Sequence, residues 1–176
     1  MKIGPQFKEG EVLLIRKPLH WTSFQVVNKL RWLIKIKLGV KKVKVGHAGT
    51  LDPLATGLII ICTGKKTKEI NHYQAAEKEY IATLKLGATT PSFDGETAEN
   101  YFYSTKHLTL EFITETCASF TGEINQLPPI FSAVKIEGKK LYESARKGKE
   151  VEIKPRKIHI NKLQVMSVNL PYIRIK

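Results

Sequence analysis

One loop of this sequence carries the residues best suited to chemistry. It runs from Gly46 to Gly57 (GHAGTLDPLATG) and holds three glycines, which let a backbone approach a ligand closely. A single carboxylate, Asp52, stands there among apolar neighbours beside Pro53, whose ring restricts the local backbone. Such a carboxylate is either a turn cap or a working acid, base or nucleophile, and local features alone favour the cap. His47 is equally open: it is a core or surface histidine, or a flat ring that stacks on a base.

Several familiar active sites are absent from the sequence. A Walker A loop needs four residues between its glycines and then Lys-Ser/Thr, whereas six residues separate Gly57 from Gly64 and Lys66 replaces the hydroxyl. The sequence has no G-x-S-x-G elbow and no G-x-G-x-x-G. The five histidines and two cysteines lack metal-ligand spacing, so we expect no metal site.

Charge is the strongest bulk feature. The chain has 29 Lys+Arg against 16 Asp+Glu, a net charge of +13, which is typical of a protein with a polyanionic partner. The bases are clustered: residues 35–44 hold five lysines and no acid, and residues 135–157 hold nine bases against four acids. No amphipathic helix with a bulky aromatic face accompanies either cluster, which disfavours a membrane surface as the partner.

The compartment is predicted from what the sequence lacks. The longest apolar run, Leu58–Cys62, is too short to span a bilayer, and the first residues contain no secretory h-region. Cys62 and Cys117 lie far apart in apolar stretches, which is typical of reduced core residues. We therefore expect a cytoplasmic protein.

Strands and helices mix without a regular βαβ rhythm, which predicts an α+β fold with a mixed, mainly antiparallel sheet. Thr22 and Gln25 have capping-box spacing at the start of the first helix. Residues 126–155, rich in bases and proline, are interpreted as a surface insertion. We expect strands at 10–18, 40–46, 58–63, 79–86, 158–168 and 172–175, and helices at 23–37, 67–76, 110–120 and 141–147.

The loop that holds Asp52 also resembles a family signature. GHAGTLDPLATGLIIICTGKKTK is similar to the signature of the TruB family of tRNA pseudouridine synthases, with the catalytic aspartate at Asp52. The resemblance covers residues 10–160 and overrides the interpretation of Asp52 as a cap. Three further stretches agree with the family in order and spacing. These stretches are Lys17-Pro18 with Thr22-Ser23, where His20 holds a place usually taken by glycine; Lys78-Glu79-Tyr80 with Leu86-Gly87 and Thr89; and Gln126-Leu127-Pro128-Pro129 through Ser132-Ala133, Lys135, Gly138, Leu141-Tyr142, Ala145-Arg146 and Gly148.

The resemblance implies a pseudouridine synthase fold and the isomerisation of a tRNA T-loop uridine (position 55) to pseudouridine. The C1′–N1 bond breaks and the base rejoins through C5, so neither a cofactor nor a metal is implied. Asp52 acts near the ribose, as nucleophile or as base at C2′. The stacked uridine must be flipped out of the loop, and the loss of stacking costs about a few kcal/mol. The family places the histidine equivalent to His47 in the vacated space and the tyrosine equivalent to Tyr80 on the uracil; otherwise Tyr80 is a core-facing strand aromatic.

The resemblance assigns the basic clusters to phosphates of the tRNA T-arm, since RNA is recognised largely by shape and backbone. The insertion at 126–155 corresponds to the family's RNA-binding thumb. Two other interpretations remain: a non-catalytic RNA-binding protein, which the presence of Asp52 disfavours, and a relative that works with a guide RNA in a larger particle. The expected RNA-binding residues are Lys41, Lys42, Lys44, Lys135, Lys139, Lys140 and Arg146.

We also expect residues 1–176 to be a truncated catalytic domain that lacks a C-terminal part and is inactive alone. The family pattern continues with a Cys-Ser-Lys-Gly-Thr-Tyr-Ile-Arg-like motif, whose arginine pairs with the catalytic aspartate. Tyr172-Ile173-Arg174 mimics the end of that motif, but the preceding residues read SVNLP and fall where an earlier strand belongs. Arg174 is therefore not assigned as the partner of Asp52.

Overall fold

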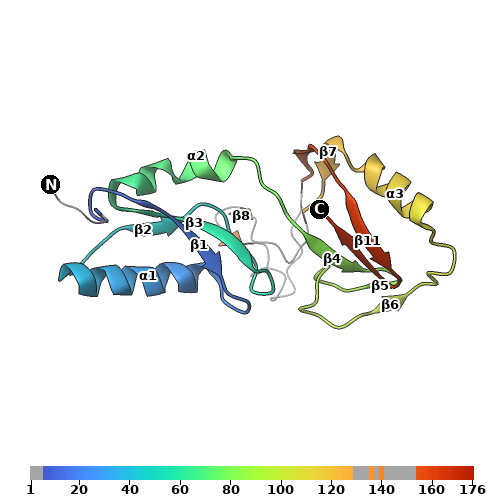
Figure 1. Cartoon of the computed structure of the whole chain (residues 1–176), viewed down its shortest axis with the longest axis horizontal. Coiled ribbons are helices and arrows are strands. Elements are labelled where there is room, and N and C mark those ends of the chain that lie inside the picture. Colours follow the sequence, from blue (N-terminus) through green and yellow to red (C-terminus); the bar gives the residue numbers. More distant parts are fainter. Residues whose placement is uncertain (1–5, 129–134, 137–138, 141–153) are drawn as a thin grey trace. The chain divides into compact units, whose positions relative to one another are not determined.

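The computed structural model describes residues 6–128, 135–136, 139–140 and 154–176. The chain divides into two units, Met1–Lys78 and Glu79–Lys176, each with sheet structure of its own (Figure 1). The predicted α+β class is confirmed, and every strand pairing among the described residues is antiparallel.

A three-stranded sheet lies at the centre of the first unit. Its middle strand reads GLIIICT, and β-branched residues of this kind suit a strand that is covered on both faces. At about 3.3 Å per residue, the two ends of this strand lie roughly 20 Å apart. The sheet order is β1 (Val12–Lys17), β3 (Gly57–Thr63) and β2 (Val45–His47).

Helix α1 (Ser23–Leu38) begins and ends with strong local signals. The Thr22 hydroxyl accepts a hydrogen bond from the Gln25 backbone N–H at 3.1 Å, and the Gln25 side chain accepts one from the Thr22 N–H at 2.7 Å. This is the predicted capping box, and it satisfies two N–H groups that the helix leaves free. Gly39 ends the helix with φ 59°, in the left-handed conformation that favours glycine.

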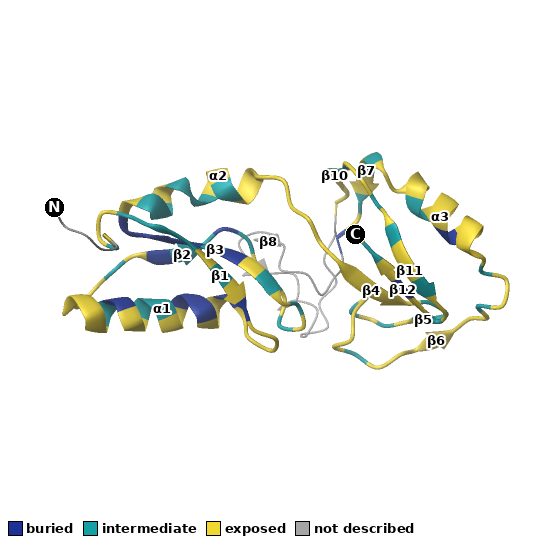
Figure 2. Ribbon diagram, viewed as in Figure 1, coloured by how far each residue is buried: buried dark blue, intermediate teal, exposed yellow. Residues whose placement is uncertain are grey.

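The core of the first unit lies between α1 and the sheet (Figure 2). Apolar residues at helical spacing point one face of α1 inward, and alternate residues of the strands meet them. Burial of each such side chain stabilises the fold by about 1.5–3 kcal/mol. The buried members of this cluster are Val26, Val27, Ile34, Val45, Ile59 and Ile61.

Beyond β3 the chain forms a 3-10 helix, η1 (Gly64–Glu69), and then helix α2 (Ile70–Ala75). A Cβ atom at Gly46 would lie 2.7 Å from Cδ1 of Ile70, so a larger residue there would require the Ile70 side chain at the start of α2 to shift. The helix predicted at 67–76 is only partly correct, because residues 67–69 belong to η1 and α2 begins at Ile70.

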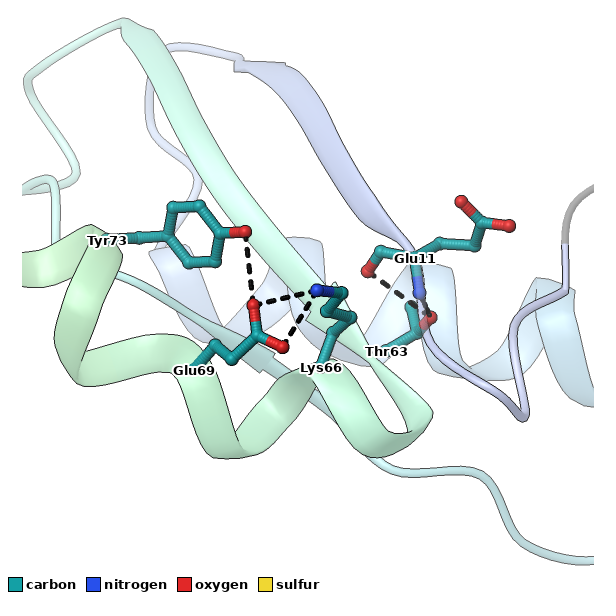
Figure 3. Close-up of polar contacts among 5 residues, drawn as sticks. All are labelled: Glu11, Thr63, Lys66, Glu69 and Tyr73. Atoms are coloured by element: carbon teal, nitrogen blue, oxygen red, sulfur yellow. Dashed lines mark hydrogen bonds and ion pairs between the residues drawn. The ribbon is translucent and has the colours of Figure 1, made fainter.

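Polar side chains close the end of β3 at Thr63 (Figure 3). The Thr63 hydroxyl accepts a hydrogen bond from the Glu11 N–H at 2.9 Å and donates to the Glu11 carbonyl at 3.5 Å. Nearby, the Lys66 ammonium donates to both carboxylate oxygens of Glu69, at 2.8 and 2.9 Å, and the Tyr73 hydroxyl donates at 3.4 Å. The hydrogen bond between the Lys66 ammonium and the Glu69 carboxylate raises the pKa of Lys66 and lowers the pKa of Glu69. The Glu69 carboxylate is thus occupied by structural contacts.

The second unit is built from small sheets and helix α3 (Leu110–Ser119), whose N-cap hydroxyl, from Thr109, accepts from the Phe112 N–H at 3.2 Å. One sheet has three strands, in the order β11 (Val165–Asn169), β12 (Tyr172–Ile175) and β4 (Ala82–Lys85). The two-stranded pairs are β10 (Arg156–Ile160) with β7 (Gly122–Gln126), β5 (Ala88–Thr89) with β6 (Tyr101–Phe102), and β8 (Lys135–Ile136) with β9 (Lys139–Lys140).

Strands β7 and β10 define where residues 127–155 leave the fold. Gln126 and Arg156 face each other as Cα partners, and Gln126 Oε1 accepts hydrogen bonds from Arg156 Nε at 3.0 Å and Nη2 at 2.8 Å. The residues at the two ends of this segment therefore lie on neighbouring strands. Its predicted helix at 141–147 lies outside the described residues.

Several predicted strand boundaries were wrong. The strand at 40–46 is only β2, because pairing with β3 begins at Val45 and the lysine-rich residues before it form a loop. The single strand at 158–168 is two strands, β10 and β11, which pair with different partners across a bend at 161–164. Continuous apolar alternation hides such a change of sheet, since both strands have the same period. The strand at 79–86 begins only at Ala82.

The two cysteines differ in environment. Both are free, but only Cys62 is buried, whereas Cys117 is half-buried on α3, where Ile113 is the buried residue. The prediction of a core position for Cys117 was therefore wrong. No helix in the described part of the chain combines the length and apolar character needed to cross a membrane.

Candidate active site

The loop that holds Asp52 connects β2 to β3 at the Gly57 end of the sheet. Directly after β2, the Ala48 N–H donates a hydrogen bond to the Ile60 carbonyl of β3 at 2.9 Å, which ties the start of the loop to the sheet. Gly49 and Gly57 have φ values of 106° and 137°, which residues with a Cβ rarely adopt. These glycines therefore shape the loop, as expected from the sequence.

Asp52 is exposed at the turn of this loop, and its carbonyl accepts a hydrogen bond from the Ala55 N–H at 3.0 Å. Its side chain does not cap the turn: within the described part of the first unit, no group donates a hydrogen bond to the carboxylate and no basic group forms an ion pair with it. Within that part of the chain, the carboxylate oxygens of Asp52 are not occupied by a structural contact.

A buried lysine lies beneath the loop. Lys17, at the end of β1, is 0% exposed, and its ammonium donates to the carbonyls of Trp21 at 2.6 Å, Pro18 at 3.0 Å and Pro53 at 3.5 Å. Burial lowers the pKa of Lys17, and the negative charge of Asp52 opposes that shift. A positive charge thus stands below Asp52 without forming an ion pair with it.

Two further groups hold the chain on either side of Asp52. The Ser23 hydroxyl bonds to both backbone groups of Leu51, accepting from its N–H at 2.9 Å and donating to its carbonyl at 3.1 Å. The His20 N–H donates to the Pro53 carbonyl at 2.8 Å. His20 has φ 63°, a left-handed conformation that explains why the family pattern usually has glycine there.

The two predicted base-contacting residues lie in different units. His47 is half-buried in β2, and its Nδ1 lies 2.7 Å from the Gly49 carbonyl. A carbonyl only accepts, so Nδ1 is the donor and Nε2 is left without its proton in the neutral ring. Tyr80 is 60% exposed and precedes β4 in the second unit, so it is not a core residue of that unit.

The predicted RNA-binding lysines fall into two groups. Lys41, Lys42 and Lys44 are exposed in the loop between α1 and β2. The Lys44 carbonyl accepts a hydrogen bond from the Gly64 N–H at 2.9 Å, so this loop lies at the end of the sheet away from Asp52. The other group comes from residues 126–155: Lys135, Lys139 and Lys140 belong to β8 and β9, and Arg146 lies outside the described residues.

Sequence reasoning missed the contributions of Lys17 and Ser23. Both lie in stretches that the family resemblance had marked, and that was the available signal. No cluster of three or more His, Cys, Asp or Glu side chains suited to a metal ion occurs among the residues that the structure describes.

Comparison with known proteins defines the class. The family described as TruB family pseudouridylate synthase (N terminal domain) matches residues 35–176, which include the loop with Asp52. The chain therefore belongs to the TruB family of pseudouridylate synthases.

Individual relatives agree with this family. The proteins called tRNA pseudouridine synthase B from Phocaeicola vulgatus and Chlorobaculum tepidum are 58% and 47% identical to this chain. The matches cover 97% of this chain and 72% of the first protein, and 98% of this chain and 71% of the second.

Two solved structures share the fold. The crystal structure of a Cbf5-Nop10-Gar1 complex matches with a TM-score of 0.62 and 25% identity, over 97% of this chain and 39% of that chain. An H/ACA RNP bound to a substrate RNA containing 2′-deoxyuridine matches with a TM-score of 0.59 and 21% identity, over 96% of this chain and 37% of that chain. The pseudouridine synthase fold expected from the sequence is confirmed.

Proposed function

We propose that this chain converts a uridine of tRNA to pseudouridine, with Asp52 as the catalytic carboxylate. The observation that carries the proposal is the Asp52 side chain itself. It is exposed in the family's GHAGTLDPLATG loop, and the described part of the first unit offers it no hydrogen-bond donor or ion-pair partner. A carboxylate held in this way by its backbone alone is free to reach a ribose.

The reaction is balanced without a second carboxylate. The C1′–N1 bond breaks, a C5–C1′ bond forms, the proton on C5 leaves and N1 takes up a proton. No water is activated, in contrast to glycoside hydrolysis, which usually needs a pair of carboxylates. Asp52 serves either as nucleophile or as base at C2′, and both routes require the ionised carboxylate. Neither route uses a cofactor or a metal, and we place the reaction in the cytoplasm.

We assign the substrate as the T-loop uridine at position 55. A uridine stacked in a folded loop must be flipped out before its ribose can meet Asp52. We assign His47 to the space that the base leaves, because the hydrogen bond from its Nδ1 to the Gly49 carbonyl fixes the ring within the same loop. We assign Tyr80 to stacking on the flipped uracil, since its ring is 60% exposed.

We propose that phosphates of the T-arm contact the basic clusters. An RNA that reaches from Asp52 to Lys41, Lys42 and Lys44 must span the length of β3, roughly 20 Å at about 3.3 Å per residue. Basic residues of the insertion at 126–155 are proposed as the second set of contacts, in a thumb attached through the Gln126–Arg156 pair.

The test is an assay on bare T-arm RNA with tritium at C5 of uridine, because the isomerisation releases that proton. The full gene product, without added RNA or protein, should release one equivalent of tritium from position 55. Release only after a guide RNA or partner proteins are added would support the guide-dependent interpretation. Binding without any release would instead support a non-catalytic RNA-binding protein.

A further inference from the structure

We infer that Ser23 is a positioning residue for Asp52: its buried hydroxyl sets the direction in which the carboxylate points, without touching the substrate. The inference rests on the proposed function, because it assumes that Asp52 reacts. Ser23 is the first residue of α1, follows the N-cap Thr22 and is only 2% exposed. A polar side chain buried to this degree is normally committed to hydrogen bonds.

The Ser23 hydroxyl uses its bonds on one residue, Leu51. It accepts from the Leu51 N–H at 2.9 Å and donates to the Leu51 carbonyl at 3.1 Å, across 28 positions of sequence. The Leu51 carbonyl belongs to the planar peptide group that leads into Asp52. Ser23 therefore fixes the plane from which the Asp52 backbone departs.

The following residue restrains Asp52 from the other side. Proline at position 53 disfavours the helical region for the residue before it, so the second backbone dihedral of Asp52 is limited too. The Pro53 carbonyl is held by the His20 N–H at 2.8 Å and approached by the Lys17 ammonium at 3.5 Å. The peptide group between Asp52 and Pro53 is itself held through the Asp52 carbonyl, which accepts a hydrogen bond from the Ala55 N–H at 3.0 Å. With both flanking peptides held, the Cα–Cβ bond of Asp52 has one direction, although its carboxylate has no hydrogen-bond donor of its own in the described part of the first unit.

The same kind of contact occurs at the opposite end of the sheet, where there is no candidate site. Thr63 is 0% exposed, and its hydroxyl also accepts from and donates to one distant residue, Glu11, at 2.9 and 3.5 Å (Figure 3). Replacing either hydroxyl removes a two-way link to the backbone from a buried site in the same unit. Only the Ser23 link leads to Asp52, so Thr63 provides the matched control.

The experiment compares Ser23→Ala with Thr63→Val in the full gene product. Three quantities are measured: the single-turnover rate of tritium release from T-arm RNA at saturating enzyme, the dissociation constant for the RNA, and the melting temperature. Both variants should lose several degrees of melting temperature. Ser23→Ala alone should lose about ten- to a hundredfold in rate, since a misplacement of about 1 Å costs up to a hundredfold. Its RNA affinity should stay within about threefold, because affinity is spread over many phosphate contacts.

Two further variants complete the test. Ser23→Thr keeps the hydroxyl and should restore most of the rate; if Ser23→Ala does not fold, Ser23→Cys, similar in volume but weaker in hydrogen bonding, takes its place. Asp52→Asn is run beside them. If Asp52→Asn is inactive while Ser23→Ala reacts as fast as Thr63→Val, the inference about Ser23 is wrong and the proposed function stands. If Asp52→Asn retains the wild-type rate, the proposed role of Asp52 itself fails.

Discussion

Asp52 and Glu69 lie beyond opposite ends of the same strand, β3: Asp52 is in the loop before it, and Glu69 is in η1 after it. Their carboxylates differ in the contacts that they make. The Glu69 carboxylate accepts two hydrogen bonds from Lys66 and one from Tyr73 (Figure 3). The Asp52 carboxylate has no such donor in the described part of the first unit, while the backbone on both sides of it is held by Ser23, His20 and Lys17.

This difference separates a structural carboxylate, Glu69, from the one that we propose to be reactive, Asp52. At Glu69 the side chain makes the contacts, so its oxygens are unavailable to a ligand. At Asp52 the contacts within the described part of the first unit are made by neighbouring backbone groups, and none of them uses the carboxylate oxygens. The negative charge of Asp52 acts on the buried Lys17 beneath the loop, where it opposes the fall in the pKa of Lys17 that burial causes, without an ion pair between the two groups.

The largest expected effect comes from exchanging each carboxylate for its amide. Asp52→Asn should lower the single-turnover rate of pseudouridine formation by at least about 10²–10⁴-fold, the usual contribution of a positioned acid–base group. RNA affinity should change less than about tenfold, because binding is distributed over many phosphates. Glu69→Gln should keep the wild-type rate. Both rates are measured by tritium release. An equal loss of rate in the two variants would mean that Asp52 has no greater role in the reaction than Glu69.

The second comparison concerns the two lysines beside these carboxylates. Lys17→Met should lower the free energy of unfolding by about 1–3 kcal/mol, because it leaves the partly buried carbonyls of Pro18 and Trp21 without the lysine donor. The same variant should also slow catalysis, since Pro53 loses a contact. Lys66→Met should change stability less than Lys17→Met does, as its ion pair with Glu69 is partly exposed to solvent. Chemical denaturation of both variants measures this, and a larger loss for Lys66→Met contradicts the assignment.

A third, smaller effect is expected for the lysines far from Asp52. Replacing Lys41, Lys42 and Lys44 with glutamine should reduce the slope of log affinity against log salt by up to about 2–3, at roughly 0.7–0.9 for each phosphate contact. The rate at saturating RNA should not change, because this loop lies at the other end of the sheet. The matched triple arginine variant keeps the charge and should keep the slope. An unaltered slope in the glutamine variant places the RNA elsewhere.

The smallest effect concerns two residues with left-handed backbones. His20→Gly should raise the free energy of unfolding by about 0.5–1 kcal/mol, because glycine adopts φ 63° without the Cβ penalty. Gly39→Ala introduces that penalty at φ 59°, where no atom lies within 4 Å to clash, and should lower stability by a similar amount. Opposite signs are the expected outcome of denaturation measurements; a loss in His20→Gly means that the imidazole makes contacts of its own worth more than the strain.

Much of the local structure follows from short stretches of sequence. The capping box of Thr22 and Gln25 spans three residues, and Gly39 ends the helix within one turn, so both depend only on neighbours in the chain. The loop from Gly46 to Gly57 was identified in the same way, from its glycines and its single carboxylate. The family resemblance supplied the role of Asp52, which local features had assigned to a cap.

What the sequence did not disclose depends on residues that are distant along the chain. The division of 158–168 into two strands depends on which partner each half pairs with, and both halves have the same period. The placement of Lys41, Lys42 and Lys44 away from Asp52 follows from the register of β2 on β3.

By itself the sequence determined the family and the start and end of α1, and it pointed to Asp52 as the proposed reactive carboxylate, since each of these is carried by consecutive residues. Only the tertiary structure decided that Ser23 bonds to Leu51, that Lys17 lies buried under Pro53, and that Asp52 is left without a donor in the described part of its unit. The physical reason is that a hydrogen bond across 28 or 36 residues depends on how the helix packs on the sheet, and no local pattern records that packing.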